Sequence, residues 1–245
     1  MATATTRAAT NPVEAVKRAW KVLGISIGVT LLFYVIPYGD VIGRPLVYLS
    51  TLVHELGHGV TAILVGGDFH KLEMWSDGSG VAWSSARSDG QHALITMGGL
   101  VGPAFAAAGG FVLARRRSWA RWGLLAVALV LLWACIFKIR TGFGFVVAGT
   151  VIAACGGVAL KATDDWAQLL LGFLSVQLAL AVFSRGDYLF MEEAHTGAGV
   201  GLSDSAAIGK LIGGPYWFWG GVCGLVSILA LAFGAWAMLR GVRKR

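Results

Sequence analysis

The chain has 245 residues, of which 56% are hydrophobic and only 13% are Asp, Glu, Lys or Arg, and its formal net charge is +7. Soluble domains carry about 25% charged residues, and one core in a domain of this size cannot hide so large an apolar excess. The composition therefore excludes a soluble globular enzyme, a disordered chain and a disulfide-stabilised secreted domain. It indicates an all-α polytopic membrane protein.

The basic residues gather at the ends of apolar segments, as in residues 115–117 and 243–245. Basic residues in such places anchor helix ends to lipid headgroups, so we expect membrane lipids as partners and no nucleic acid. The cysteines lie inside apolar segments, where packing explains them better than disulfides or metal binding. They are Cys135, Cys155 and Cys223.

The chain begins with a polar, basic segment, residues 1–21, which lacks the pattern of a cleaved signal peptide and predicts a cytoplasmic tail. Seven apolar segments follow, and a membrane helix needs about 20 residues. Length favours seven crossings. The positive-inside rule favours six, because Lys and Arg would divide less evenly between the two sides if 141–160 did not cross. We therefore predict six or seven transmembrane helices in one domain, 22–240, followed by a basic tail, 241–245, and leave the oligomeric state open. The apolar segments are 22–39, 45–66, 93–114, 122–137, 141–160, 166–183 and 211–239.

Two connections are long enough to hold structure of their own. In residues 67–90, two strand-like segments, 71–76 and 80–84, flank an Asp-Gly pair. Such a turn predicts a β-hairpin, here between the second and third helices. Residues 184–210 are the other long polar stretch, with four of the thirteen acidic residues of the chain.

The apolar segment 45–66 contains His54, Glu55 and His58 in the pattern His-Glu-x-x-His. Ionisable groups at membrane depth cost several kcal/mol unless they are paired, so they indicate function. The two histidines stand one helical turn apart and can reach one metal ion, while Glu55 projects about 100° away, where it can accept a proton from a metal-bound water. A single His or Glu in an apolar helix more often makes an interhelical hydrogen bond, but the complete pattern predicts a zinc site with Glu55 as general base.

HELGH in a membrane helix, followed by a Gly-rich hairpin and a helix that opens with GGLVGPAFAA, resembles the site-2 protease family of intramembrane zinc metallopeptidases. The closest resemblance is to the compact bacterial branch without PDZ domains. It runs from about residue 45 to 220 and includes FSRGDYLF and LSDSAAIGKLIGGP. The resemblance implies that His54, His58 and a distant Asp bind zinc, that Glu55 is the general base, and that the protein lies in a bacterial inner membrane.

The distant Asp has to be chosen without a motif, because the family's Asn-Pro-Asp-Gly and Leu-Asp-Gly strings are absent from the chain. Asp187 is favoured, since it follows the apolar segment 166–183 near the place where the family has its ligand. Asp204 is the alternative, although a helix N-cap is the simpler interpretation of that position. His195 could also ligate zinc. The other acidic candidates are Asp164 and Asp165, which are typical of a solvated interfacial pair, and Glu192 and Glu193.

Four further residues are not expected to take part in metal binding or catalysis. His70 and His92 lie in a loop and at a helix start, where surface exposure is more common than metal ligation. Gly98 and Gly102 have the spacing that lets two helices pack closely.

These features predict cleavage of peptide bonds in or next to the transmembrane segments of membrane-tethered proteins or peptides. A helical substrate must unwind locally, and the unwound segment could add as a strand to the hairpin along Leu72, Met74 and Val81. Two alternatives from other classes remain, a non-proteolytic zinc-binding membrane protein and an ion transporter. Glu55 argues against the first, because a structural zinc site needs no free base, and the absence of an inverted repeat argues against the second.

Overall fold

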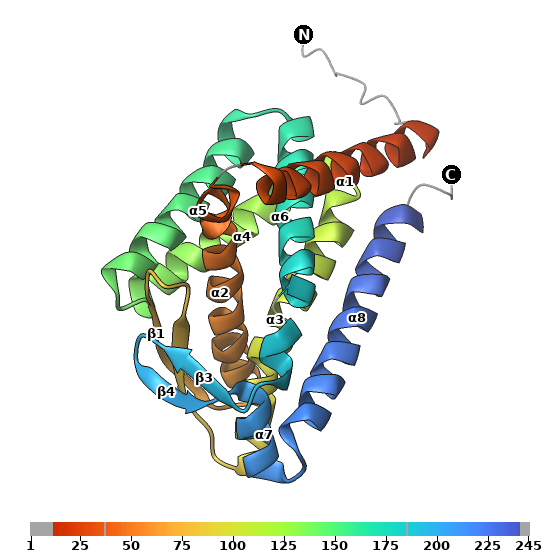
Figure 1. Cartoon of the computed structure of the whole chain (residues 1–245). Coiled ribbons are helices and arrows are strands. Elements are labelled where there is room, and N and C mark those ends of the chain that lie inside the picture. The colour runs from red at the N-terminus through yellow and green to blue at the C-terminus, as the bar shows by residue number, and fades with distance from the viewer. Residues whose placement is uncertain (1–11, 37, 185, 241–245) are drawn as a thin grey trace.

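The structure is a computed structural model and describes residues 12–36, 38–184 and 186–240. Helices dominate this part of the chain and pack as a bundle, which confirms the predicted all-α fold (Figure 1). The long helices are α1 (Pro12–Val35), α2 (Gly39–Leu64), α3 (Asp89–Ala114), α4 (Arg117–Phe137), α5 (Gly142–Lys161), α6 (Asp164–Ser184) and α8 (Tyr216–Arg240).

Five helices of the described chain are long and apolar enough to cross a membrane, namely α3, α4, α5, α6 with the turn that follows it, and α8. α2 runs alongside them, although its two histidines and its glutamate lower its mean hydropathy. α1 instead lies across one end of the bundle (Figure 1), and its most apolar part is the short stretch Leu23–Leu32. With α2, six helices of the described chain run along the bundle, but they are not the six that the positive-inside rule favoured: 141–160, which that count left out, is the membrane-length helix α5, and the segment that lies across the end is α1.

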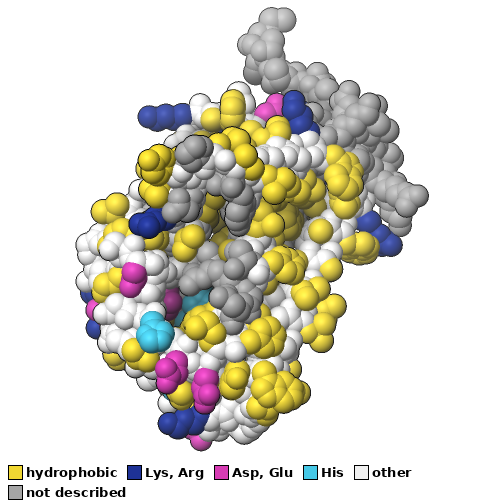
Figure 2. Space-filling view, viewed as in Figure 1, with side chains coloured by type: hydrophobic (Ala, Val, Ile, Leu, Met, Phe, Trp, Pro, Cys, Tyr) yellow, Lys and Arg dark blue, Asp and Glu magenta, His cyan; other side chains and the backbone are white. Residues whose placement is uncertain are grey.

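Large apolar side chains cover the outer faces of these helices, as Figure 2 shows for one side of the molecule. Trp122, Leu229 and Phe233 are each at least 60% exposed. A soluble surface rarely exposes apolar area on this scale, so these faces are suited to lipid.

Part of the predicted polar tail, 1–21, is helical, because α1 begins at Pro12. Proline is favoured in the first turn of a helix, and the residues that follow it are mostly good helix formers. Residues 1–11 and the predicted basic tail, 241–245, lie outside the described residues.

The predicted hairpin between the second and third helices is confirmed. Strands β1 (Asp68–Met74) and β2 (Gly80–Ser85) pair antiparallel. In the turn, the Ser79 hydroxyl donates to Asp77 Oδ1 at 2.7 Å and the Ser79 backbone N–H donates to the same atom at 2.8 Å. These hydrogen bonds hold the pKa of Asp77 below its usual value and keep the turn closed.

The outer edge of β1 is already occupied. Leu72 N–H donates to Lys138 O at 2.9 Å, and Arg140 N–H donates to Leu72 O at 3.0 Å. Met74 N–H donates to Thr141 Oγ1 at 3.1 Å. Because Leu72 and Met74 are also 0% exposed, they are not available to a substrate strand, contrary to the sequence-based expectation. The edge left for strand addition is that of β2, which carries Val81.

The polar stretch 184–210 folds into structure that the sequence did not reveal. A 3-10 helix (Gly186–Phe190) leads into a second antiparallel hairpin, β3 (Glu193–Thr196) and β4 (Gly199–Leu202), and then into α7 (Asp204–Ile212). The second hairpin lies against the turn of the first, where Gly197 N–H donates to Ser79 Oγ at 2.9 Å.

The predicted apolar segment 211–239 is not one helix. Gly213 and Gly214 have positive φ angles of 84° and 95°, and Pro215 follows them, so the chain turns between α7 and α8. This turn keeps α7 at the end of the bundle that also holds the two hairpins (Figure 1).

Close packing of α2 on α3 confirms the structural role predicted for two glycines. A Cβ at Gly98 would overlap Thr61 of α2, and a Cβ at Gly102 would lie 3.1 Å from the Cα of Gly57. The cysteines are all free, with Cys155 and Cys223 buried, which agrees with packing.

Candidate metal centre

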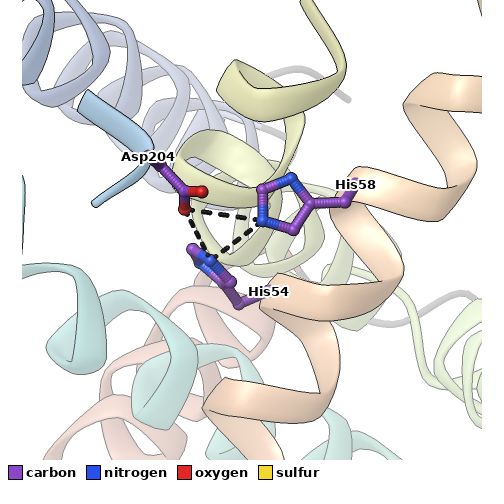
Figure 3. A group of neighbouring side chains, drawn as sticks. All are labelled: His54, His58 and Asp204. Carbon is purple, nitrogen blue, oxygen red and sulfur yellow. Dashed lines mark hydrogen bonds and ion pairs between the residues drawn. The ribbon is translucent and has the colours of Figure 1, made fainter. Parts of the chain in front are cut away.

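The centre begins with the two histidines of α2, which point to the same side of the helix as their spacing predicted (Figure 3). The Nε2 atoms of His54 and His58 lie 3.2 Å apart, and the two rings stand nearly perpendicular at an interplanar angle of 85°. Two ring nitrogens at this separation can bind the same ion.

A backbone carbonyl of α3 orients the His58 ring. His58 Nδ1 lies 2.9 Å from Ile95 O, and a carbonyl can only accept, so Nδ1 carries the proton and donates it. The lone pair is then on Nε2, which faces His54. Metal-binding histidines are commonly fixed in this way by a hydrogen bond from their other ring nitrogen.

Gly99 makes room for the same ring. A Cβ at this position would overlap the His58 imidazole, so only glycine lets α3 approach this face of α2. No local pattern predicts this contact, because Gly99 is one of many glycines in apolar segments.

The third group comes from the start of α7. Asp204 Oδ2 lies 2.9 Å from His54 Nε2 and 3.4 Å from His58 Nε2 (Figure 3). Ser203 is the N-cap of α7, since its hydroxyl accepts from Ala206 N–H at 3.2 Å and donates to Met191 O at 2.6 Å. The helix N-cap is therefore Ser203 and not Asp204, so the Asp204 carboxylate is free to face the histidines.

Of the two carboxylates proposed from the sequence as third ligand, the structure brings the alternative, Asp204, to the histidines. Asp187, which the sequence favoured, lies in the 3-10 helix after α6, and its side chain is outside the described part of the chain. Its neighbour Tyr188 places its ring 6.0 Å from that of His54, so this segment also borders the centre.

The three groups suit a metal ion. Their ligand atoms all lie within 4.8 Å of one another. Asp204 Oδ2 is buried, and among the described residues only the ring nitrogens of His54 and His58 lie close enough to interact with it. A cation bound between the three atoms would satisfy all of them, and two imidazoles with one carboxylate are a donor set that zinc accepts in catalytic sites.

Glu55 lies beside this group without being part of it. Its residue is 5% exposed, and it lines a pocket together with His54. The walls of the pocket come from α2, α3, α6, the 3-10 helix and the two hairpins. His195, also considered from the sequence as a ligand, lines the pocket from β3 but does not belong to the group of three.

The remaining candidates lie away from the centre. His70 and His92 are exposed, as expected. Asp164 and Asp165 pair with arginines at the other end of the bundle, at 2.8 Å from Arg121 Nε and Arg117 Nε respectively.

Comparison with known proteins gives one match. The profile of the family described as Peptidase M50B-like matches residues 25–234, which include every element of the metal centre. Neither a curated protein nor a solved structure matches the chain. The strands of the described residues form only the two hairpins, in agreement with a compact member without a PDZ domain. The chain therefore belongs to the Peptidase M50B-like family, which is the site-2 protease family that its HELGH helix and Gly-rich hairpin resemble.

Proposed function

We propose that the chain is a zinc-dependent endopeptidase that hydrolyses peptide bonds in or next to the transmembrane segments of membrane-tethered proteins. The observation that carries the proposal is the convergence of His54 Nε2, His58 Nε2 and Asp204 Oδ2 beside the buried Glu55. The family match supports the same class of reaction.

His54, His58 and Asp204 would hold the ion. Zinc, when bound, supplies a Lewis acid that polarises a carbonyl and lowers the pKa of a water molecule to about 7. Glu55 would take the proton from the attacking water and deliver it to the leaving amide nitrogen, so that it acts first as base and then as acid.

The open edge of β2 supports a place for the substrate. Leu72 directs its N–H and C=O away from β2, so its partner Ala82 directs its own N–H and C=O away from β1 in the same way. An extended substrate segment could pair along this edge through the C=O of Ala82, since the Ala82 N–H already hydrogen-bonds to Glu55 and Val81 directs its backbone groups toward β1. Gly80 of the same strand lies next to Glu55, so the paired segment would pass the general base.

The test is to reconstitute the purified protein in liposomes with a single-span membrane protein as substrate, and to measure both zinc per protein and cleavage. Stoichiometric zinc with cleavage that a chelator abolishes is expected. Zinc without cleavage of any membrane substrate would favour the non-proteolytic alternative, and zinc-independent ion flux across the liposome would favour the transporter.

A further inference from the structure

One face of α2 holds the turn of the first hairpin just before Glu55. Tyr48 Oη donates to Ser76 O at 3.0 Å, and Thr51 Oγ1 donates to Gly78 O at 2.7 Å. Residues three or four apart lie on the same helix face, so Tyr48, Thr51 and Glu55 follow one another along the hairpin. The two hydrogen bonds fix the position of the turn relative to the general base.

The hairpin meets Glu55 at Gly80, the first residue of β2. A Cβ at this position would lie 2.8 Å from Glu55 Cγ, 3.0 Å from Glu55 Oε1 and 2.9 Å from Thr51 Cγ2. No real Cβ has room at these distances, so the strand backbone packs directly on the Glu55 side chain. The backbone of Ala82 also hydrogen-bonds to this carboxylate.

We propose that the turn of the first hairpin positions Glu55, with Thr51 and Gly80 as the positioning residues; this inference rests on the function proposed above. Thr51 is 3% exposed and Glu55 is 5% exposed, so neither side chain is free to move independently of the hairpin. Neither Thr51 nor Gly80 belongs to the metal-binding group, so the role is separable from metal binding. Because a displacement of about 1 Å in a catalytic group can cost about 100-fold in rate, such positioning affects turnover.

Thr51→Val tests the hydrogen bond to the turn, because valine keeps the shape of threonine and lacks its hydroxyl. The expected result is a fall in kcat of about 10- to 100-fold, with unchanged KM and unchanged zinc per protein. Thr51→Ser restores the donor and is expected to recover most of the lost kcat. A purely structural role in folding would instead lower kcat and zinc content together.

Gly80→Ala tests the close contact with Glu55. The added methyl group must displace the carboxylate, so kcat is expected to fall by about 100-fold while zinc remains bound. The matched control is Gly201→Ala, in a strand of the second hairpin, where a Cβ would meet nothing within 4 Å. This control is expected to cleave at the wild-type rate.

Hydrogen exchange of the segment 74–82 provides a readout that does not depend on activity. In both metal-free and zinc-loaded protein, Thr51→Val is expected to exchange faster than wild type in this segment, and Thr51→Ser is not. Unchanged exchange in Thr51→Val, unchanged kcat in a protein that cleaves, or loss of zinc in step with kcat would each overturn the positioning role. Failure of the wild-type protein to cleave would instead refute the proposed function, and the exchange result would still decide whether Thr51 fixes the turn.

Discussion

At the scale of single residues, the Glu55 side chain leaves α2 in a different direction from His54 and His58, so it lies beside the proposed ligands and is not one of them. It is buried beside the group of three ligand atoms and contributes none of them. We predict that Glu55→Gln keeps zinc stoichiometric and lowers the cleavage rate by about 10²- to 10⁴-fold, the usual contribution of a general base. Metal analysis and a liposome cleavage assay on the same preparation measure both quantities.

The control for this substitution is His54→Ala, which removes a ligand and should lose zinc and activity together. Cleavage by the Gln variant at the wild-type rate would show that another group accepts the proton.

Asp204 is expected to be the third protein ligand. Its Oδ2 atom lies within 3.4 Å of both ring nitrogens and otherwise has no partner among the described residues. Asp204→Ala should therefore lower zinc occupancy strongly and abolish cleavage, whereas Asp187→Ala should retain zinc, because three protein ligands already complete a catalytic site. Zinc content of both variants decides between them, and loss of zinc from the Asp187 variant alone would return the assignment to the 3-10 helix.

At the scale of helices and strands, the contact between α2 and α3 decides the orientation of a ligand. Gly99 of α3 lies against the His58 ring, and Ile95 O of the same helix binds its Nδ1. Gly99→Ala should push the ring away from both contacts and weaken zinc binding by about 10- to 100-fold, the usual effect of losing support behind a ligand.

A competition titration with a zinc chelator measures this affinity. Gly109→Ala on the same helix is the matched control, because a Cβ there meets nothing within 4 Å. Alanine is the better helix former, so this variant should bind zinc normally and be stabilised by up to about 1 kcal/mol. Equal zinc affinity in the two variants would show that the α2–α3 contact does not orient His58.

At the scale of the whole molecule, the two ends of the bundle differ in charge. Arg121 bonds to Asp164 and to Ala162 O, which places the α3–α4 and α5–α6 connections together, and the packing of Gly234 on Ala108 brings the end of α8 to the same side. This end carries Arg115, Arg116, Arg117, Arg121, Lys161 and Arg240. The opposite end, with the hairpins and α7, carries Lys71, Arg87, Lys138, Arg140 and Lys210, of which Lys71 and Lys138 are half-buried.

The positive-inside rule therefore predicts that the arginine-rich end faces the cytoplasm and that the hairpins face the other side. A membrane-impermeant maleimide applied to intact cells tests this orientation. Val200→Cys, at a site 64% exposed on the second hairpin, should react, and Lys161→Cys should react only after the cells are broken. The opposite labelling pattern would reverse the orientation.

Much of this architecture follows from local properties of the chain. The apolar segments become helices because their length and composition suit a membrane, and Asp77-Gly78 closes the first hairpin because glycine accepts the φ of 91° found there. The second hairpin was not predicted, because β4 has two glycines among its four residues and all four are exposed, so no alternating pattern marks it.

The amino-acid sequence by itself determined that this is a membrane protein, and it predicted a metal site at His54 and His58 with Glu55 beside it, because a spacing of four residues on a helix fixes which side chains share a face. Only the tertiary structure decided what meets that face. Asp204 lies 146 positions after His58, and its approach depends on the glycine-lined contact of α2 with α3 and on the turn before α8. Such contacts join segments remote in the chain, and no local pattern of residues encodes the distance between them.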